Sequence, residues 1–260
     1  MDKQVSIEPA KARGLRSWNL WMGFFHLAQG VLMLILSTKF TLPVLGNFLQ
    51  FDVQTQTLKP IAEKLFEINI GYAVAAFLLM SALAHFLIST VLYKWYIANL
   101  ARHINIARWV EYSLSSSLML VVIAMLVGLY DIGTLIMLVG LNASMILFGW
   151  MMELHNQSTQ ETNWTAFIFG CIAGIIPWIA IAIYLFYSGE GDYRAPDFVY
   201  WIYFSIFVFF NSFAINQVLQ YKKVGKWQDY LYGEKVYIIL SLVAKSLLAW
   251  QVFAGTLRPM

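Results

Sequence analysis

Long runs of apolar residues, interrupted by charged or turn-forming residues, divide most of the sequence into segments of about 20 residues or more. A hydrocarbon core about 30 Å thick is crossed by about 20 residues of helix. The runs do not alternate between polar and apolar residues, which favours helices over the strands of a membrane barrel. We therefore predict an all-α membrane protein, a single seven-helix domain over residues 1–260. The predicted spans are residues 18–36, 68–92, 106–130, 132–152, 164–187, 198–221 and 236–257.

Two connections between the runs differ sharply in length. The first, residues 37–67, is long enough to hold structure of its own and carries Asn47 and Asp52. We predict an ordered outer loop that covers the bundle or contacts a second copy, with a binding lid as the alternative. The third and fourth runs are separated by little more than Asp131 and Gly133, which predicts a tight antiparallel pair.

The composition is typical of a protein that lies in a lipid bilayer. Hydrophobic residues make up 60% of the chain and charged residues 12%, whereas soluble domains contain about 45–50% and about 25%. The net charge of +3, with dispersed basic residues, argues against nucleic-acid binding. Cys171 is the only cysteine, so an intramolecular disulfide is excluded, and we interpret it as a packing residue. The run from Trp18 lacks a convincing cleavage site, so we expect a retained span rather than a signal peptide.

Lys and Arg residues are unevenly divided between the two ends of the predicted bundle. Eleven of the 17 fall in the N-terminal tail, around the second connection and in the sixth connection, and five fall on the other side. Basic residues are enriched on the cytoplasmic side of membrane proteins. We therefore predict a multi-pass protein of the cell membrane with a cytoplasmic N-terminus and an extracellular C-terminus.

Two charged residues lie deep in the apolar runs. Lys245 is near the middle of the last run, and Glu111, in the third, is the only carboxylate that we place clearly inside a run. Because an isolated charge at this depth is costly, we expect the two to pair. Pairing would require the third helix to begin nearer Leu100 and the lysine stem to reach toward the cytoplasm. The pair is either a structural ion pair or a lysine that forms a Schiff base with an aldehyde, with the carboxylate as counterion.

Other polar residues share helical faces with this pair or with each other. Ser241 precedes Lys245 by one turn, and Ser115 follows Glu111 by one turn. Such residues are more commonly interhelical hydrogen bonds than reactive groups, although histidines can hold or pass a proton near neutral pH. A metal site is disfavoured because the histidines lie on different helices and Glu111 already has a partner. The remaining pairs on one face are His26 with Gln29, and Ser81 with His85.

The fourth, fifth and sixth runs contain rings and small residues that would suit a long apolar ligand. Pro177 can bend the fifth helix and turn the Trp178 indole inward, and Gly149 leaves space. Phe209 and Phe210 add rings from the sixth run. These residues are also ordinary packing in membrane helices, so alone they do not indicate a ligand.

Several stretches of the sequence resemble one family. They are Arg108-Trp-Val-Glu-Tyr-Ser-Leu-Ser-Ser-Ser, Asn142-Ala-Ser-Met-Ile-Leu-Phe-Gly-Trp, and Leu240-Ser-Leu-Val-Ala-Lys-Ser followed by Ala249-Trp-Gln. Shorter matches are Phe25-His-Leu-Ala-Gln, Cys171-Ile-Ala-Gly and Phe209-Phe-Asn-Ser-Phe-Ala. Together they resemble the heliorhodopsins, retinal-binding relatives of the microbial rhodopsins, over the whole chain.

The resemblance implies that all-trans retinal is bound to Lys245 as a protonated Schiff base, with Glu111 as counterion and Ser241 hydrogen-bonded near the imine. It also implies an inverted orientation, a homodimer, and a slow photocycle without evident ion transport, and no enzymatic activity is expected. The other implied residues of the retinal site are Ser115, Asn142, Met145, Gly149, Trp178, Phe209, Phe210 and Trp250. A polar, hydrated cavity on the cytoplasmic side of the imine would be lined by His26, Gln29, Ser81, His85 and Tyr112.

The leading hypothesis is a light sensor that signals to a cytoplasmic partner, and the alternative is a light-driven or light-gated proton or ion transporter. Outward proton pumps that resemble bacteriorhodopsin carry a second carboxylate eleven residues past the first in the third helix. This chain has Val122 there, which argues against pumping. A light-independent receptor or scaffold with a Lys245–Glu111 salt bridge would have no visible chromophore.

Overall fold

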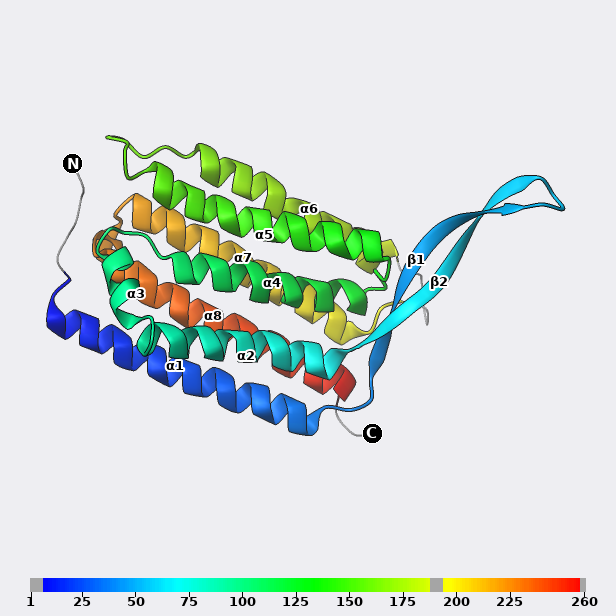
Figure 1. The fold of residues 1–260 in the computed structure, drawn as a ribbon, viewed down its shortest axis with the longest axis horizontal. Coiled ribbons are helices and arrows are strands. Elements are labelled where there is room, and N and C mark those ends of the chain that lie inside the picture. Colours follow the sequence, from blue (N-terminus) through cyan, green and yellow to red (C-terminus); the bar gives the residue numbers. More distant parts are fainter. Residues whose placement is uncertain (1–6, 188–193, 258–260) are drawn as a thin grey trace.

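The computed structural model describes residues 7–187 and 194–257, whose helices form one elongated bundle (Figure 1). Seven helices in this part of the chain are long and apolar enough to cross a membrane, which confirms the predicted number. They are α1 (Pro9–Leu36), α2 (Ile70–Ser89), α4 (Ile106–Leu126), α5 (Ile132–His155), α6 (Thr165–Tyr187), α7 (Asp197–Tyr221) and α8 (Tyr230–Val252). Shorter elements are β1 (Thr41–Asp52), β2 (Thr57–Asn69), α3 (Tyr93–Leu100), a 3₁₀ turn (Gly225–Gln228) and a π-helical turn (Phe253–Leu257).

α5 and α8 extend beyond the predicted spans, and both of these extensions carry a carboxylate. α8 begins at Tyr230, where the Asp229 side chain caps the helix by accepting a hydrogen bond from the Leu231 backbone N–H. α5 continues to His155. The prediction ended the one span just before Glu153 and began the other just after Glu234 and Lys235, and the structure instead buries both glutamates inside the helices. Elsewhere, α1 starts before residue 18, and α2 and α4 end before residues 92 and 130.

α4 runs through the middle of the bundle in Figure 1, with the α1–α2 pair on one side and the α5–α6 pair on the other. Apolar side chains pack into two clusters, of which the larger lies toward the β-hairpin and includes Phe77, Val122 and Ile206. The smaller cluster lies toward α3 and includes Leu15 and Leu100. The buried charged side chains of the described chain lie between the larger cluster and the α3 end. The half of the bundle toward the hairpin is therefore the more apolar one.

The predicted ordered loop is a β-hairpin, in which β1 and β2 pair antiparallel with an irregularity between Val44 and Leu45. The hairpin extends away from the end of the bundle (Figure 1). Its base is fixed to the α4–α5 turn, because Leu45 N–H donates to the Tyr130 carbonyl at 2.9 Å and Asn47 donates to Asp131 at 3.0 Å. Asp131 also caps α5, and the hydrogen bond from the Thr134 backbone lowers the pKa of its carboxyl group. The structure thus confirms an ordered loop and the tight turn after α4.

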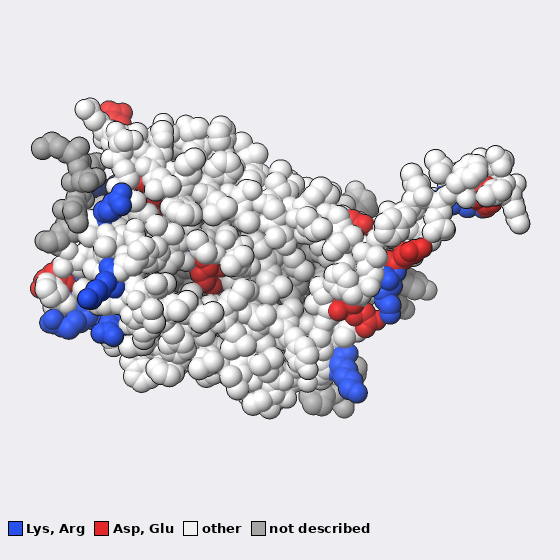
Figure 2. Space-filling model, viewed as in Figure 1, with Lys and Arg blue, Asp and Glu red and all other residues white. Residues whose placement is uncertain are grey.

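Charge is unevenly distributed over the face shown in Figure 2. Lys and Arg gather at the end where α3 lies, both signs occur near the hairpin, and the band between is almost uncharged. This distribution agrees with the sequence count, although Lys3 and Arg258, which entered that count, lie outside the described residues. α3 itself was not predicted, and it is held by Tyr96 and Leu100, which are buried against the smaller apolar cluster.

Candidate functional site

Lys245 and Glu111 form an ion pair inside the bundle. Lys245 Nζ lies 2.8 Å from Glu111 Oε1 and 3.0 Å from Ser241 Oγ. Ser81 Oγ donates to the same carboxylate oxygen at 2.6 Å. The Lys245 side chain is only 3% exposed and that of Glu111 10%. The structure therefore brings these predicted residues together from α2, α4 and α8.

The register of α4 against α8 explains how the two charges meet. α4 begins at Ile106, so the expected start near Leu100 is wrong. Asn105, which caps α4, donates from its side chain to Glu234 of α8 at 2.6 Å and so places the two helix starts side by side. From this level Glu111 is about 9 Å along α4, whereas Lys245 is about 16 Å along α8. The lysine stem covers the difference because helical side chains point back toward the helix N-terminus.

A cavity of about 360 Å³ extends from Lys245 between α4, α5, α6, α7 and α8. This volume lies within the range of about 300–1,000 Å³ that is usual for small-molecule sites. The walls are mainly apolar and include several aromatic rings, and the centre of the Trp178 ring lies 5.2 Å from the centres of the Phe207 and Phe210 rings. Cys171 also lines the cavity. The predicted residues that line it are Tyr112, Met145, Gly149, Trp178, Phe210, Ser241 and Lys245.

Some predicted residues lie outside this cavity. Trp250 is five residues past Lys245, which turns it about 140° around the helix, and its indole donates to Gln29 at 3.1 Å. The structure therefore places Trp250 and Gln29 against each other and in the lining of neither cavity. Phe209 precedes the lining residue Phe210 by one position and does not itself line the cavity. Asn142 bonds Ser116 and Ser117 behind the wall, and Ser115 is fully buried one turn past Glu111.

A second, polar cavity of about 30 Å³ lies on the α3 side of the ion pair. Ser81, His85, Glu111 and Tyr112 line it, as predicted, and Asn19 joins them. His85 Nδ1 is 2.8 Å from the Asn19 side-chain oxygen. The His26 ring is stacked on His85 at 5.6 Å and lies behind the wall. This volume is large enough to hold a water molecule among polar partners.

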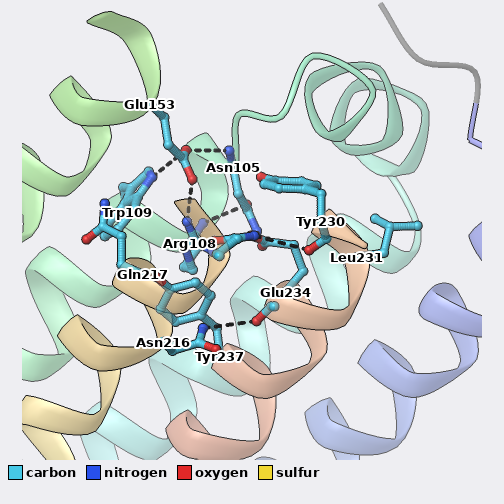
Figure 3. Close-up of polar contacts among 12 residues, drawn as sticks. Asn105, Arg108, Trp109, Glu153, Asn216, Gln217, Tyr230, Leu231, Glu234 and Tyr237 are labelled. Carbon is cyan, nitrogen blue, oxygen red and sulfur yellow. Dashed lines mark hydrogen bonds and ion pairs between the residues drawn. The ribbon is translucent and has the colours of Figure 1, made fainter. Parts of the chain in front are cut away.

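A second buried charge group borders the polar cavity, and the sequence interpretation missed it (Figure 3). Arg108 bonds Glu153 of α5 and Glu234 of α8, and we call these three residues the Arg108 cluster. The Arg108 guanidinium also lies over the rings of Trp109, at 4.3 Å, and Tyr237, at 3.8 Å. The expectation that Glu111 is the only deep carboxylate is therefore wrong. One signal was present: Arg108 also needed a buried partner, and Glu111 could not serve both Arg108 and Lys245.

The arrangement around Lys245 suits imine chemistry. An amine in an apolar cavity can condense with an aldehyde, and the adjacent carboxylate would stabilise the positive charge of the product. Among the described residues that line the large cavity, Lys245 is the only lysine. The site therefore fits a long, apolar aldehyde.

Comparisons with known proteins agree with this geometry. The family model described as Heliorhodopsin matches residues 15–257. Among solved structures, that of a light-driven proton pump, LR (Mac) from Leptosphaeria maculans, has a TM-score of 0.63 and 14% sequence identity, with 96% of each chain covered. At this identity the likeness shows the fold alone. No curated protein sequence matches significantly.

Proposed function

Since the chain belongs to the heliorhodopsin family and is thus a retinal-binding, multi-pass membrane rhodopsin, we propose that it is a light-sensing photoreceptor that does not pump ions. In this proposal all-trans retinal is attached to Lys245, and Glu111 is its counterion. The observation that carries the proposal is the 2.8 Å pair of Lys245 Nζ and Glu111 Oε1 at the end of the large aromatic cavity.

The residues of the cavity fit retinal in shape and chemistry. Aromatic side chains, among them Trp178 and Phe210, form an apolar channel, and Gly149 and Gly174 leave room where a methyl group would meet Trp109 or Met145. When bound, retinal supplies a conjugated chain that absorbs light and isomerises, joined to Lys245 Nζ as a protonated Schiff base.

The chain's own groups then control the proton at Lys245 Nζ. Glu111 favours the charged form in the dark because an opposite charge lies within hydrogen-bond distance. Ser241 orients the nitrogen, and Ser81 holds the carboxylate oxygen that faces it. A proton that leaves Nζ reaches Glu111 directly, and the polar cavity with His85 offers it a further position on the α3 side.

The uneven distribution of polar groups supports sensing rather than pumping. Transport across the membrane needs proton-accepting or proton-donating groups on both sides of the lysine. On the hairpin side of Lys245 the described core is apolar, and Val122 is fully buried within it. Voltage-clamped cells that express the protein should therefore show no sustained photocurrent. A light-evoked current that reverses with the proton gradient would instead establish the alternative, a light-driven or light-gated transporter.

We assign the α3 end to the cytoplasm and the hairpin to the outside of the cell membrane. The basic residues at the α3 end support this orientation. A cysteine introduced at the hairpin tip, Gln54→Cys in a Cys171→Ser background, should react with an impermeant maleimide on intact cells. In the matched variant, Arg102→Cys in the same background, the cysteine lies beside α3 and should react only after the cells are opened. The reverse pattern contradicts the assignment.

We also propose that the protein is a homodimer that signals to a partner on the cytoplasmic face. The hairpin exposes several large apolar side chains, more than an isolated surface loop would tolerate. They include Phe48, Leu49, Phe51, Val53 and Leu58. Replacing Phe51 and Leu58 by Asp should convert the detergent-solubilised protein from dimer to monomer, as measured by light scattering, and an unchanged mass would exclude the hairpin from the interface.

A further inference from the structure

Trp109 lies at the boundary between the large cavity and the Arg108 cluster (Figure 3). Its ring lines the cavity, and its Nε1 donates to Glu153 Oε2 at 2.6 Å. On one side the ring lies under the Arg108 guanidinium. On another it occupies the space over Gly149, where a Cβ would overlap the ring. The position of this cavity wall therefore depends on groups outside the cavity.

The two carboxylates of the Arg108 cluster are not equivalent. Glu153 Oε1 accepts from Arg108, and its Oε2 accepts from Trp109 and from the Asn105 backbone N–H at 2.9 Å. Glu234 accepts from Arg108, from the Asn105 side chain and from Gln220 at 3.3 Å. Both carboxylates thus hold Arg108 and Asn105, but of the two only Glu153 has a hydrogen bond to the cavity wall in the described structure.

We propose that Glu153 is a positioning residue for the bound chromophore, because it fixes the Trp109 indole as the wall of the retinal cavity. This inference rests on the proposed function, which places retinal there. A hydrogen bond from a neutral donor to a carboxylate is stronger than one between neutral groups, so it holds the indole plane firmly. Without it, the ring turns about its side-chain torsions and changes both the shape and the polarizability of the wall.

The same carboxylate connects the wall to the end of the bundle that carries α3. Glu153 Oε2 accepts from Trp109 and from Asn105, the residue that caps α4 and ends the connection from α3. A displacement of the indole ring therefore reaches this connection through one shared oxygen atom. Glu153 thereby gives the retinal cavity a direct contact with the face on which we place the signalling partner.

The test compares Glu153→Gln with Glu234→Gln, a matched control in the same cluster. Each substitution removes one of two carboxylates and leaves Arg108 one charged partner. In Glu153→Gln the three donors, Arg108, Trp109 and the Asn105 backbone N–H, meet a side chain with only one acceptor oxygen. The hydrogen bond from Trp109 Nε1 is therefore weakened. The first readout is the indole N–H resonance of Trp109 in retinal-free protein labelled with ¹⁵N-tryptophan, assigned by its loss in Trp109→Phe. The second is the visible absorption maximum after retinal is added.

We expect Glu153→Gln to move the Trp109 indole proton upfield and to shift the absorption maximum, and Glu234→Gln to change neither. Glu153→Asp keeps the charge but withdraws the oxygen by one methylene, and it should move both readouts in the same direction even if Glu153→Gln fails to fold. The proposal is overturned if both Glu153 variants leave the indole resonance in place, or if Glu234→Gln moves it equally. If the unmodified protein never becomes coloured with retinal but the indole resonance still shifts in Glu153→Gln, the proposed function is refuted. The positioning of the Trp109 indole by Glu153 is not.

Discussion

The bundle holds two buried charge groups that are built differently. Lys245 faces one carboxylate, Glu111, at the end of a large cavity. Arg108 faces two carboxylates and also lies over the rings of Trp109 and Tyr237. A lysine ammonium can lose its proton and react with an aldehyde, whereas an arginine guanidinium stays charged in proteins. The cation that can react thus lies at the cavity, and the cation that cannot lies where α4, α5 and α8 meet.

The difference in hydrogen bonding has a consequence for stability. In the Arg108 cluster, Asn105, Trp109 and Gln220 donate to the carboxylates, so the group joins α4, α5, α7 and α8 with the connection before α4. At the Lys245 pair, hydroxyl groups hold one oxygen of Glu111 and the amine. We therefore expect changes at Lys245 and Glu111 to alter colour, and changes at Arg108 to alter folding.

The largest effect is expected at the lysine. Lys245→Ala should abolish the visible band of protein reconstituted with all-trans retinal, because no other described cavity residue carries a primary amine. Lys245→Arg is the matched control, since it keeps the positive charge beside Glu111 but does not form the imine. Absorption spectra of the purified proteins decide the matter: a coloured Lys245→Ala protein would mean that retinal is attached elsewhere.

Neutralising the counterion should have the next largest effect on colour. Glu111→Gln should shift the band to longer wavelength and lower the pH at which the visible band is lost by roughly two to three units, since a charge at about 4 Å contributes about 4 kcal/mol at an intermediate dielectric. Glu234→Gln also neutralises a buried carboxylate but lies in the other group, and it should leave that pH unchanged. If Glu111→Gln and Glu234→Gln shift this pH equally, Glu111 has no special role as the counterion.

Breaking the Arg108 cluster should reduce stability without removing colour. Arg108→Met leaves two carboxylates buried without a cation, and the loss of one partner of a buried ion pair costs about 3–5 kcal/mol. The free energy of unfolding, measured by reversible titration with SDS, should fall by that amount, while the folded fraction still binds retinal. Adding Glu153→Gln and Glu234→Gln should restore most of the loss, because no unpaired charge then remains. An undiminished stability in Arg108→Met contradicts the structural role.

The smallest effect on stability is expected at a carboxylate near the surface, Asp131, which serves as a reference for the two buried charge groups. Asp131 caps α5 by accepting from the Thr134 backbone at 2.8 Å, and Asp131→Ala should lower the free energy of unfolding by about 0.5–1 kcal/mol at neutral pH. Because its pKa is lowered in the fold, this contribution is complete above about pH 5 and is lost as the pH falls below the ordinary value of 3.8. Asp131→Asn, which caps without a charge, should show no such pH dependence. If the free energy of unfolding depends on pH equally in Asp131→Asn and in the unmodified protein, a group other than Asp131 causes that dependence.

The helices were predictable because the bilayer imposes their length and polarity. Seven apolar runs appear as seven helices, and the long loop is ordered. The hairpin was not predicted as strands, because its exposed apolar residues lack the alternation of a half-buried sheet. The end of α5 and the start of α8 were misplaced for a different reason: Glu153 and Glu234 resemble solvent-facing helix ends until Arg108 is placed between them.

The reactive pair could be recognised from the sequence, and much of its surroundings could not. Lys245 and Glu111 are 134 positions apart in the sequence, yet the scarcity of charge in the apolar runs was enough to pair them. The orientation of a ring depends on helix rotation, which the sequence motif does not contain. Trp109, which lines the cavity, was therefore missed, and Trp250, which was expected at the ligand, lies on another face of α8 from Lys245.

The attachment of retinal to Lys245 is the central claim, and chemical trapping tests it most directly. The coloured protein is reduced with borohydride, which converts an imine to a stable amine, and is then digested and analysed by mass spectrometry. We predict a retinyl group on the α8 peptide at Lys245 and on no other lysine. A retinyl group on a different lysine, or a coloured protein with none on Lys245, would contradict the account.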